Sequence, residues 1–340
     1  MQLIQSTIGL LLMAALASCA PKTFSPVTVT LSPGVVGTNF NTNYYQISAT
    51  ALAPAVTGLN SPMDICFDTS GNFYICDAGN NQIKKYNSSE VFVTGWGSAG
   101  AATGQFNHPA GIVYHPSGYI FVSDRSNHRI QRFLPDGSSP IAFGSFGTGN
   151  TQFKEPIGLA VDKWGYLYVC DWVNCRVVKY DVNGNYQNAQ FGSKGSGTGN
   201  FSNNAGIAIN NAGTIYVSDN SNYKIKWYNQ GFGFLLQWGS TPGSAFGQYD
   251  VPWGLAFNSS KEFLLQCDMM NNRFYQDNIN LYSSATYGSA GVANNQFNTP
   301  RGLSYDLTTN AYICDSGNNR ICKWNVLKMV VQTNIITNQI

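Results

Sequence analysis

The chain has 340 residues, a formal net charge of +2 and 11% charged residues. Its length allows one large or two ordinary domains. Asn, Ser, Thr, Gly and Gln carry the polarity and there is no basic run, which argues against a nucleic-acid partner because affinity for phosphate backbones depends on clustered Lys and Arg.

The first 18 residues are typical of an export signal. The apolar run 8–16 is too short to span a membrane and is followed by small residues. Residues 16–19, Leu-Ala-Ser-Cys, resemble a bacterial lipobox, which predicts lipidation of Cys19; the alternative is an ordinary cleavage site that happens to precede a cysteine. We therefore expect an exported protein. It is either a cell-envelope lipoprotein (outer membrane or cell surface) held to the membrane through Cys19, or it is secreted.

Two segments, residues 19–42 and 43–57, lie between the predicted export signal and the repeats. Residues 19–42 contain several Pro and Gly and show no period, which indicates a flexible tether. Residues 43–57 contain a short strand-like segment whose place depends on the repeats that follow it.

A polar motif recurs six times between residue 58 and about residue 328. Each copy has an Asp followed three residues later by Asn and five residues later by Gln, Arg or Lys, and consecutive Asp residues are 47, 47, 48, 49 and 47 positions apart. The Asp residues are Asp77, Asp124, Asp171, Asp219, Asp268 and Asp315, and the Asn residues are Asn80, Asn127, Asn174, Asn222, Asn271 and Asn318. Self-similarity at this period is typical of a blade array or a solenoid.

Each copy of the motif is interpreted as a strand, a tight turn and a return strand. The Asp and Asn side chains can bond their own backbone two residues on, so we expect them to cap the turn. Six copies in one register indicate a structural role, because an active site would need only one.

Each repeat unit contains four short strand-like segments. The first follows Pro-x-Gly, as in residues 109–112, and the second ends at the motif Asp. The third carries an aromatic residue at a fixed position, except in the fifth copy, which has Asp277. The fourth ends in aromatic-Gly-Ser, as in residues 143–145. Four short strands with turns between them predict a propeller blade.

These patterns, together with a Gly-Gln-Phe that follows them, resemble the NHL repeat in six copies of about 47 residues. The resemblance implies an all-β fold, a six-bladed β-propeller. A closed ring leaves no open sheet edge, and two segments compete for the last strand of blade 6. Residues 43–57 are favoured because they would clasp the ring from both chain ends; residues 329–340 are a tail or the alternative closing strand.

Seven cysteines follow Cys19. Export implies an oxidising compartment, in which close pairs can form disulfides. The candidate pairs are Cys66 with Cys76, Cys170 with Cys175, and Cys314 with Cys322. The alternative concerns Cys76, Cys170, Cys267 and Cys314, which stand where other copies have Ser123 and Ser218; these would be small buried residues without bridges.

The copies differ from one another where the strand entrances and motif turns should surround the mouth of a central channel. Asp64 replaces the repeat Gly in blade 1, while blades 6 and 5 bring Arg301 and Trp253. We expect these residues, extended by Trp172 and Tyr223, to form a recognition cluster. The alternative is that Asp64 and Arg301 simply pair to close the ring.

The sequence offers few candidate metal ligands around the predicted channel mouth. In the resembling amidating lyases, zinc lies on His residues placed directly after the blade Pro, and none of the corresponding residues here is His: they are Met63, Ala110, Ile157, Ala205, Trp253 and Arg301. The three histidines His108, His115 and His128 all fall within blade 2 and are expected to face solvent. By the same resemblance, Asp64 is a candidate ligand of a calcium ion in the central channel. A lactonase propeller would need several acidic and Asn ligands on the axis, and only Asp64 is visible there.

We therefore expect a binding or scaffold module rather than an enzyme. Its ligand would be a protein, a peptide or a glycan at the mouth, and no catalytic residue is assigned. The alternative is a metal-assisted propeller enzyme, amidating-lyase-like or lactonase-like, whose site is built from positions that break the repeat.

Overall fold

A computed structural model describes residues 43–245, 247–279 and 283–333. The chain divides into two compact units, residues 45–330 and residues 1–44 with 331–340. Nearly all of the second unit, with the leader 1–18, Cys19, the tether 19–42 and the end of the tail, lies outside the described residues. No helix in the described ranges is long and apolar enough to cross a membrane.

In the described residues, the strands form six four-stranded sheets. Blade 1 contains β2 (Pro62–Phe67), β3 (Phe73–Asp77), β4 (Gln82–Tyr86) and β5 (Phe92–Trp96). Blade 2 contains β6 (Pro109–His115), β7 (Tyr119–Asp124), β8 (Arg129–Phe133) and β9 (Ile141–Phe143). Blade 3 contains β10 (Pro156–Val161), β11 (Leu167–Asp171), β12 (Arg176–Tyr180) and β13 (Tyr186–Phe191). Blade 4 contains β14 (Asn204–Ile209), β15 (Ile215–Asp219), β16 (Lys224–Tyr228) and β17 (Phe234–Trp238).

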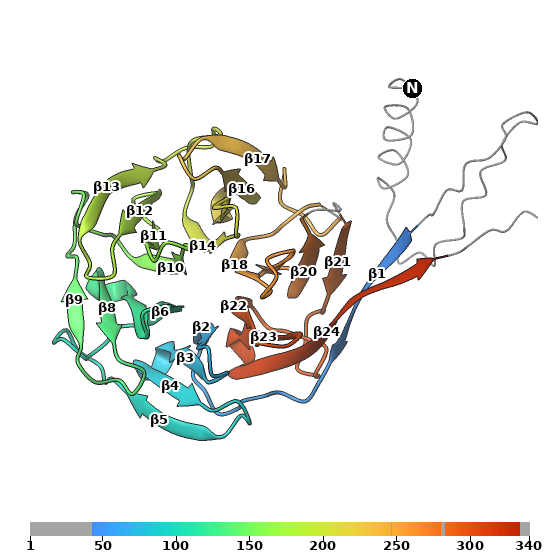
Figure 1. Ribbon diagram of the computed structural model, residues 1–340, viewed down its shortest axis with the longest axis horizontal. Helices are drawn as coiled ribbons and strands as arrows, with labels where there is room; N and C mark the ends of the chain where they lie inside the picture. The colour runs from blue at the N-terminus through green and yellow to red at the C-terminus, as the bar shows by residue number, and fades with distance from the viewer. Residues whose placement is uncertain (1–42, 246, 280–282, 334–340) are drawn as a thin grey trace, which may run out of the picture. The chain divides into compact units, whose positions relative to one another are not determined.

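Blade 5 contains β18 (Pro252–Phe257), β19 (Phe263–Asp268), β20 (Arg273–Asn278) and β21 (Ser283–Tyr287). Blade 6 contains β22 (Pro300–Tyr305), β23 (Asn310–Asp315), β24 (Arg320–Thr333) and β1 (Asn43–Ala51). One-turn 3-10 helices follow the motif Asp at η1 (Ala78–Asn80), η2 (Arg125–Asn127), η3 (Asn220–Asn222) and η4 (Ser316–Asn318). The blades surround a common axis with the first strand of each repeat innermost (Figure 1). The predicted all-β, six-bladed propeller is confirmed.

The N-terminal segment occupies the outer edge of blade 6. β1 lies beside β24, and the residues after it continue the pairing: the Leu52 amide donates to the Lys323 carbonyl at 2.9 Å, and Ile321 donates to the Val56 carbonyl at 2.8 Å. Residues 329–332 belong to β24 itself, the third strand. Blade 6 is thus built from both ends of the repeat array, with β1 as its fourth strand.

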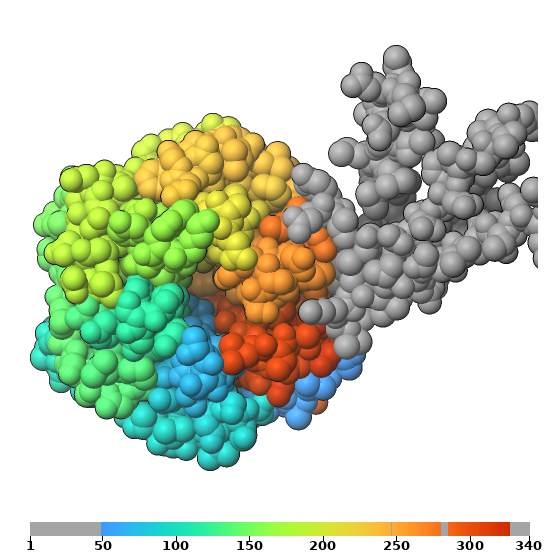
Figure 2. Space-filling model, in the orientation of Figure 1, coloured from blue at the N-terminus to red at the C-terminus, as the bar shows by residue number. Residues whose placement is uncertain are grey.

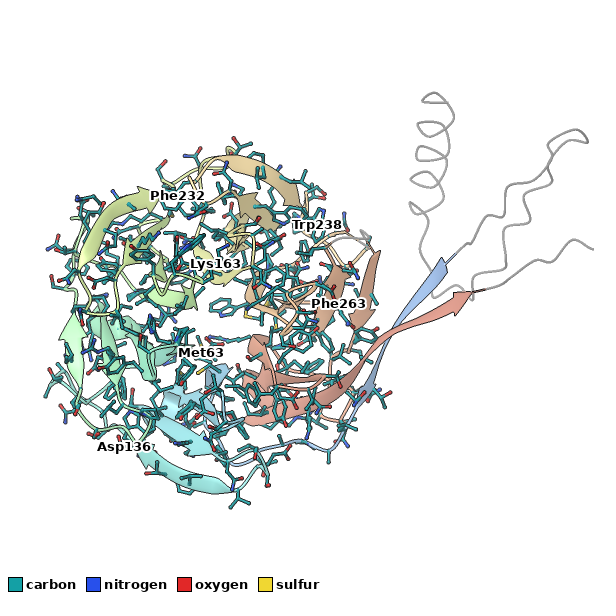
Figure 3. The ribbon with its side chains drawn as sticks, in the orientation of Figure 1. Met63, Asp136, Lys163, Phe232, Trp238 and Phe263 are labelled. Carbon is teal, nitrogen blue, oxygen red and sulfur yellow. The ribbon has the colours of Figure 1, made fainter. Side chains whose placement is uncertain are left out.

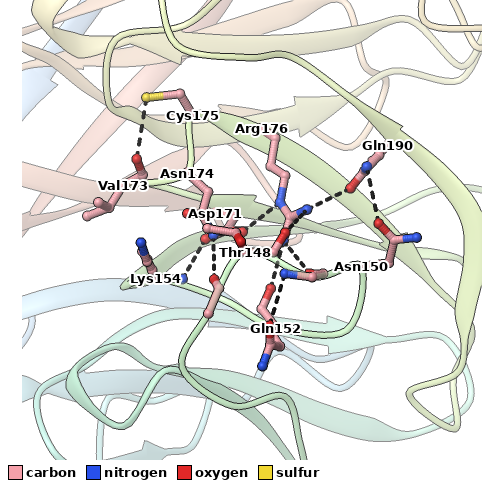
Figure 4. Close-up of polar contacts among 12 residues, drawn as sticks. Thr148, Asn150, Gln152, Lys154, Asp171, Val173, Asn174, Cys175, Arg176 and Gln190 are labelled. Carbon is pink, nitrogen blue, oxygen red and sulfur yellow. Dashed lines mark hydrogen bonds and ion pairs between the residues drawn. The ribbon is translucent and has the colours of Figure 1, made fainter.

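The motif side chains connect each turn to the loop that enters the same blade (Figure 4). Asp171 accepts a hydrogen bond from the Lys154 amide at 2.7 Å, and its other oxygen accepts from Asn174 and pairs with Arg176, both at 2.8 Å. All six copies repeat the bonds to the distant amide and to Asn. This differs from the expected turn cap. At the four 3-10 turns the Asp makes no cap bond, because its carboxylate is directed at the entering loop.

The cation that neutralises the motif Asp does not stand at one sequence offset. In blades 2, 3, 5 and 6 it is the Arg five residues later. In blades 1 and 4 it is instead a lysine seven residues later, Lys84 or Lys226. In blade 4 both Lys226 and Asp219 are fully buried, so this ion pair lies entirely inside the protein.

All seven cysteines after Cys19 are buried and free, so none of the three expected bridges is present. The strand register explains this. Cys66 lies opposite Tyr74 and not Cys76, while Cys314 lies opposite Ile321, which puts Cys314 and Cys322 on different faces of the sheet. Cys175 sits at a left-handed turn position with φ of 56° and directs its sulfur toward the Val173 carbonyl. The cysteines therefore behave as small core residues.

Candidate functional site

The six innermost strands line a central cavity of about 260 Å³. Their first residues pair with the motif Asp at the end of the second strand, as Pro156 does with Asp171, so strand entrances and motif turns share one face. We call it the mouth-side face. Met63 lies beside the ring axis at the inner end of blade 1 (Figure 3). Figure 2 shows that the surface is hollowed near the centre, where the blades meet.

The cavity wall is largely apolar because it consists of the buried first strands. Its polar side chains in the described residues are few: Asp64, Tyr114, Lys261 and Ser304. Asp64 is the one carboxylate among them. The repeat Gly in the other blades explains why. A Cβ built on Gly158 would overlap the Ala205 carbonyl oxygen of the next blade, so neighbouring first strands come too close for most side chains.

Asp64 replaces this glycine at the seam between blades 1 and 2. One carboxylate oxygen accepts a hydrogen bond from the Ile112 amide of blade 2 at 3.0 Å. Burial raises the pKa of Asp64 to about 7, although hydrogen bonds from the Ile112 and Ile65 amides oppose the shift. A paired cation would lower the pKa instead. Asp64 therefore links blades 1 and 2 and forms part of the cavity wall. It has no cationic partner in the described residues.

Arg301 is not paired with Asp64, which rejects the expectation that the two close the ring together. No ion pair between them occurs among the described residues; Arg301 instead lies over the Trp253 ring, with its guanidinium carbon 5.0 Å from the ring centroid. Its Nη1 contacts the Met63 sulfur at 2.8 Å, and its buried Nε has no hydrogen-bond partner. Burial lowers the pKa of Arg301, and the positive charge of Arg125 adds to this effect.

A second arginine–tryptophan stack lies on the same face. Arg125 of blade 2 lies over the Trp172 ring of blade 3, 4.7 Å from its centroid, and pairs with the half-exposed Glu155 at 2.6 Å. The Trp172 indole nitrogen is buried without a hydrogen-bond partner. Sequence reasoning missed Arg125, yet a signal was available: at the turn position directly after the motif Asp, the other copies have Ala78, Trp172, Asn220, Met269 and Ser316. We call Arg125, Trp172, Trp253 and Arg301 the mouth cluster.

Tyr223 stands apart from the mouth cluster. It ends η3 in the left-handed conformation with φ of 58°, and its amide donates to the Asn220 carbonyl. It does not line the cavity. Of the five predicted ligand-binding residues, the structure thus joins Arg301 to Trp253 and, through Arg125, places Trp172 beside the same mouth, while Asp64 lies inside the channel.

The histidines are less exposed than expected. His115 is 2% exposed, and its ring bonds the Gly165 carbonyl at 2.9 Å and the Ser117 amide at 3.0 Å, which joins blades 2 and 3 at the face opposite the mouth. His128 accepts from the Glu155 amide. His108 lies near the mouth: burial lowers its pKa, and the charges of Arg125 and Arg301 lower it further, against Glu155. None of these rings points to a shared ion.

The donor set does not fit a catalytic metal. No group of three or more His, Cys, Asp or Glu side chains in the described residues could hold one. Calcium prefers six to eight oxygen ligands, and Asp64 offers a single carboxylate already bonded to Ile112. Calcium at Asp64 stays a prediction for calorimetry on the wild type and Asp64→Ala.

The family model described as SMP-30/gluconolactonase/LRE-like region matches residues 11–194, which is more than half of the 340 residues. No curated protein sequence matches.

Solved propellers resemble the structure at low sequence identity. An auxiliary nutrient binding protein from Bacteroides thetaiotaomicron has a TM-score of 0.59 at 14% identity, over 79% of this chain and 70% of that one. A catalytically inactive virginiamycin B lyase from Staphylococcus aureus with quinupristin has a TM-score of 0.55 at 14% identity, over 78% and 80%. A PQQ-bound aldose sugar dehydrogenase from Streptomyces coelicolor has a TM-score of 0.60 at 13% identity, over 84% and 100%.

These structural likenesses extend to the fold alone, because proteins that share one fold perform different functions. The family match goes further, since it covers residues 11–194, which include the first three blades of this chain. The chain belongs to the SMP-30/gluconolactonase/LRE-like family of β-propellers.

Proposed function

We propose that this chain is an exported, lipid-anchored propeller that acts as a binding or scaffold module for a protein, peptide or glycan ligand on its mouth-side face. The observation that carries the proposal is the contrast between channel and mouth. The channel wall offers one carboxylate, held by a backbone amide, whereas the mouth presents two arginine–tryptophan stacks. Arginine and tryptophan are the residues that most often dominate binding energy at protein interfaces.

The resemblance to a nutrient-binding propeller agrees with this proposal. A binding function also needs no convergent donor set on the axis, which matches the apolar first strands. Two buried polar atoms at the mouth, the Arg301 Nε and the Trp172 indole nitrogen, have no hydrogen-bond partner, and a buried donor without an acceptor costs about 1–3 kcal/mol.

Export and anchoring rest on the sequence alone. The apolar run 8–16 and the lipobox-like residues 16–19 support them. Radiolabelled palmitate should enter the wild type and fail to enter Cys19→Ala. Absence of label in the wild type would leave plain secretion.

Capture from the native envelope tests the binding face. A matched pair of variants is available: Trp172→Ala at the mouth, and Trp164→Ala, which removes an indole that is 48% exposed in the turn between β10 and β11 at the opposite face. The captured ligand should be lost with the first variant and retained with the second. Equal capture by both variants contradicts a mouth-side site.

A metal-assisted propeller enzyme is the second candidate. The family match and the likeness to a lyase favour it. Elemental analysis of the purified chain discriminates between the two: a stoichiometric metal that disappears in Asp64→Ala supports the enzyme, and its absence in the wild type supports the binding module.

A further inference from the structure

We propose that the mouth cluster recognises a carboxylate on an extended peptide segment, with Arg301 and Arg125 as its cationic contacts. This inference rests on the proposed binding function and narrows its ligand class. It follows from four observations: the bonding state of Arg301, the arrangement of the two stacks, the local charge, and the burial of the tryptophan faces.

Arg301 lacks the acceptor that arginines normally have. Among the described residues, Arg125, Arg129, Arg176, Arg273 and Arg320 each pair with a carboxylate. Arg132 donates to the Val182 carbonyl. Arg301 has only the Met63 thioether, a weak acceptor, although it is partly buried. Desolvating a charge without a counter-ion is unfavourable, so an incoming anion gains more here than at the other arginines.

The two stacks lie on either side of blade 1. Trp172, Arg125, Met63, Arg301 and Trp253 come from blades 3, 2, 1, 6 and 5 in that order around the mouth. The two guanidinium groups are close enough for the charge of Arg125 to lower the pKa of Arg301. Each tryptophan holds its arginine by a cation–π contact, which limits the side-chain entropy lost when a ligand binds.

The charge at the mouth is positive in a protein with few charges. Arg125 pairs with the carboxylate of Glu155, whose side chain is 34% exposed, whereas Arg301 makes no ion pair in the described part of the chain. His108 contributes little positive charge because burial and the two arginines lower its pKa. Asp64 lies inside the channel, where its pKa near 7 keeps part of the population neutral at neutral pH. An anion at the mouth therefore meets a net attractive field.

The tryptophans favour a peptide over a glycan. Sugar recognition usually requires an open aromatic face, but Trp253 is 8% exposed and Arg301 covers its ring, while Arg125 covers Trp172. The exposed apolar side chains nearby include Val173 at 41% and Met270 at 51%, at equivalent turn positions of blades 3 and 5. Phe146 is 64% exposed beside His128, but Lys154 lies over its ring at 5.4 Å from the centroid. A carboxylate for the arginines and apolar side chains for Val173 and Met270 describe an acidic peptide with apolar neighbours.

The test uses the full chain, its intrinsic tryptophan fluorescence and an array of N-acetylated hexapeptides. Each peptide carries Glu beside Leu or Phe, and a matched peptide has Gln in place of Glu. Binding should favour Glu over Gln by about tenfold or more, as expected for a charge contact at an interface, and should weaken between 50 and 300 mM salt. Arg301→Gln and Arg125→Gln should each abolish the Glu preference.

Arg132→Gln is the matched control. Arg132 of β8 also stacks on an aromatic ring, Tyr119 at 4.2 Å, but Tyr119 stands at the end of β7 that is far from the mouth. Removal of Arg132 should leave the Glu preference unchanged. If Arg301→Gln does not fold, the Glu-to-Gln ratio and salt dependence of the wild type still decide the outcome.

Three results overturn the inference: equal binding of Glu and Gln peptides, no peptide binding at all, or binding only of oligogalacturonate or inorganic phosphate in parallel titrations. If a captured ligand still depends on Trp172 while the array shows no Glu preference, the inference fails and the proposed binding function stands. If capture does not depend on Trp172 and the array shows no Glu preference, the mouth is not a binding face.

Discussion

Asp64 illustrates how one side chain adapts a seam that elsewhere accepts only glycine. At Gly158 and Gly302, a Cβ would overlap atoms of the next blade. At the blade 1–blade 2 seam the carboxylate instead accepts the Ile112 amide. Burial disfavours its charged form and raises its pKa to about 7. A residue of this kind makes the stability of the propeller depend on pH.

The free energy of unfolding should fall as the pH rises from about 4 to about 7. The folded protein binds the Asp64 proton more tightly than the unfolded chain, whose pKa is near the ordinary 3.8, so ionisation of Asp64 between pH 4 and 7 destabilises the fold. In Asp64→Asn, the neutral amide can keep the bond from Ile112, and this part of the pH dependence should disappear. Urea midpoints at pH 5 and pH 8 measure it.

Asp136→Asn controls for general charge effects. This surface carboxylate has its pKa lowered, chiefly by a hydrogen bond from the Ser138 hydroxyl, so its substitution should leave the wild-type decline between pH 5 and 8 in place. The same decline in Asp64→Asn as in the wild type would contradict the assignment to Asp64.

Lys226 provides a second test at the scale of one residue. Its ammonium group is buried with Asp219 at 2.8 Å and also donates to the Gly197 and Asn200 carbonyls. Lys226→Met leaves a buried carboxylate without its cation, which should cost about 3–5 kcal/mol. The neighbouring Lys224→Met should change stability by about 0.5 kcal/mol or less. Denaturant unfolding measures the free energy of unfolding of both variants. Similar losses of stability in the two would mean that Lys224 shares the ion pair.

At the scale of elements, the close approach of the first strands sets the width of the channel. Gly158→Ala places a methyl group against the Ala205 carbonyl of the neighbouring blade, and backbone cannot move aside as a side-chain end can. We expect a loss of about 1–3 kcal/mol or more, as for other overpacked sites. Gly199→Ala meets no atom within 4 Å and is the control. Equal midpoints for the two variants would show that the strands separate easily.

The repeat predicted the elements well because it is local and periodic. Asp171 and Asn174 recur at fixed offsets, so strand, turn and strand could be assigned from the sequence. The ion pairs of Lys84 and Lys226 could not be predicted, because these lysines stand seven residues after the motif Asp and the repeating basic position stands five residues after it. Which face of the sheet Cys314 and Cys322 occupy depends on how β23 and β24 are paired. Their spacing of eight residues in the sequence does not determine this pairing.

The mouth cluster could be predicted only in part for a related reason. Trp253 and Arg301 stand out as departures from the repeat, but their stacking joins blades 5 and 6. Arg125 meets Trp172 across another blade boundary. Such contacts depend on how closely the blades approach around the axis, and a pattern of one-dimensional spacings contains no such information.

For the whole molecule, the decisive element is the strand that closes blade 6. Deleting residues 1–57 removes β1 and the bonds of Leu52, Ala55 and Val56 to residues 321–323. Three hydrogen bonds at about 1 kcal/mol each and burial of Val56, worth about 2 kcal/mol, give a loss of at least about 5 kcal/mol, because the pairing of β1 with β24 is lost as well. For a large domain this lowers the Tm by about 10 °C or more. It also exposes the edge of β24, which invites association.

A chain that begins at residue 43 is the control, because it lacks the predicted leader and tether but keeps β1. It should melt with the full chain, whereas the chain that begins at residue 58 should melt lower and show aggregation by light scattering. Equal melting of the two truncated chains would mean that β1 adds nothing to ring closure. A loss in both would place the stabilising contacts before residue 43. Because blade 6 alone draws strands from both ends of the chain, only this pair of truncations separates closure of the ring from the stability of its blades.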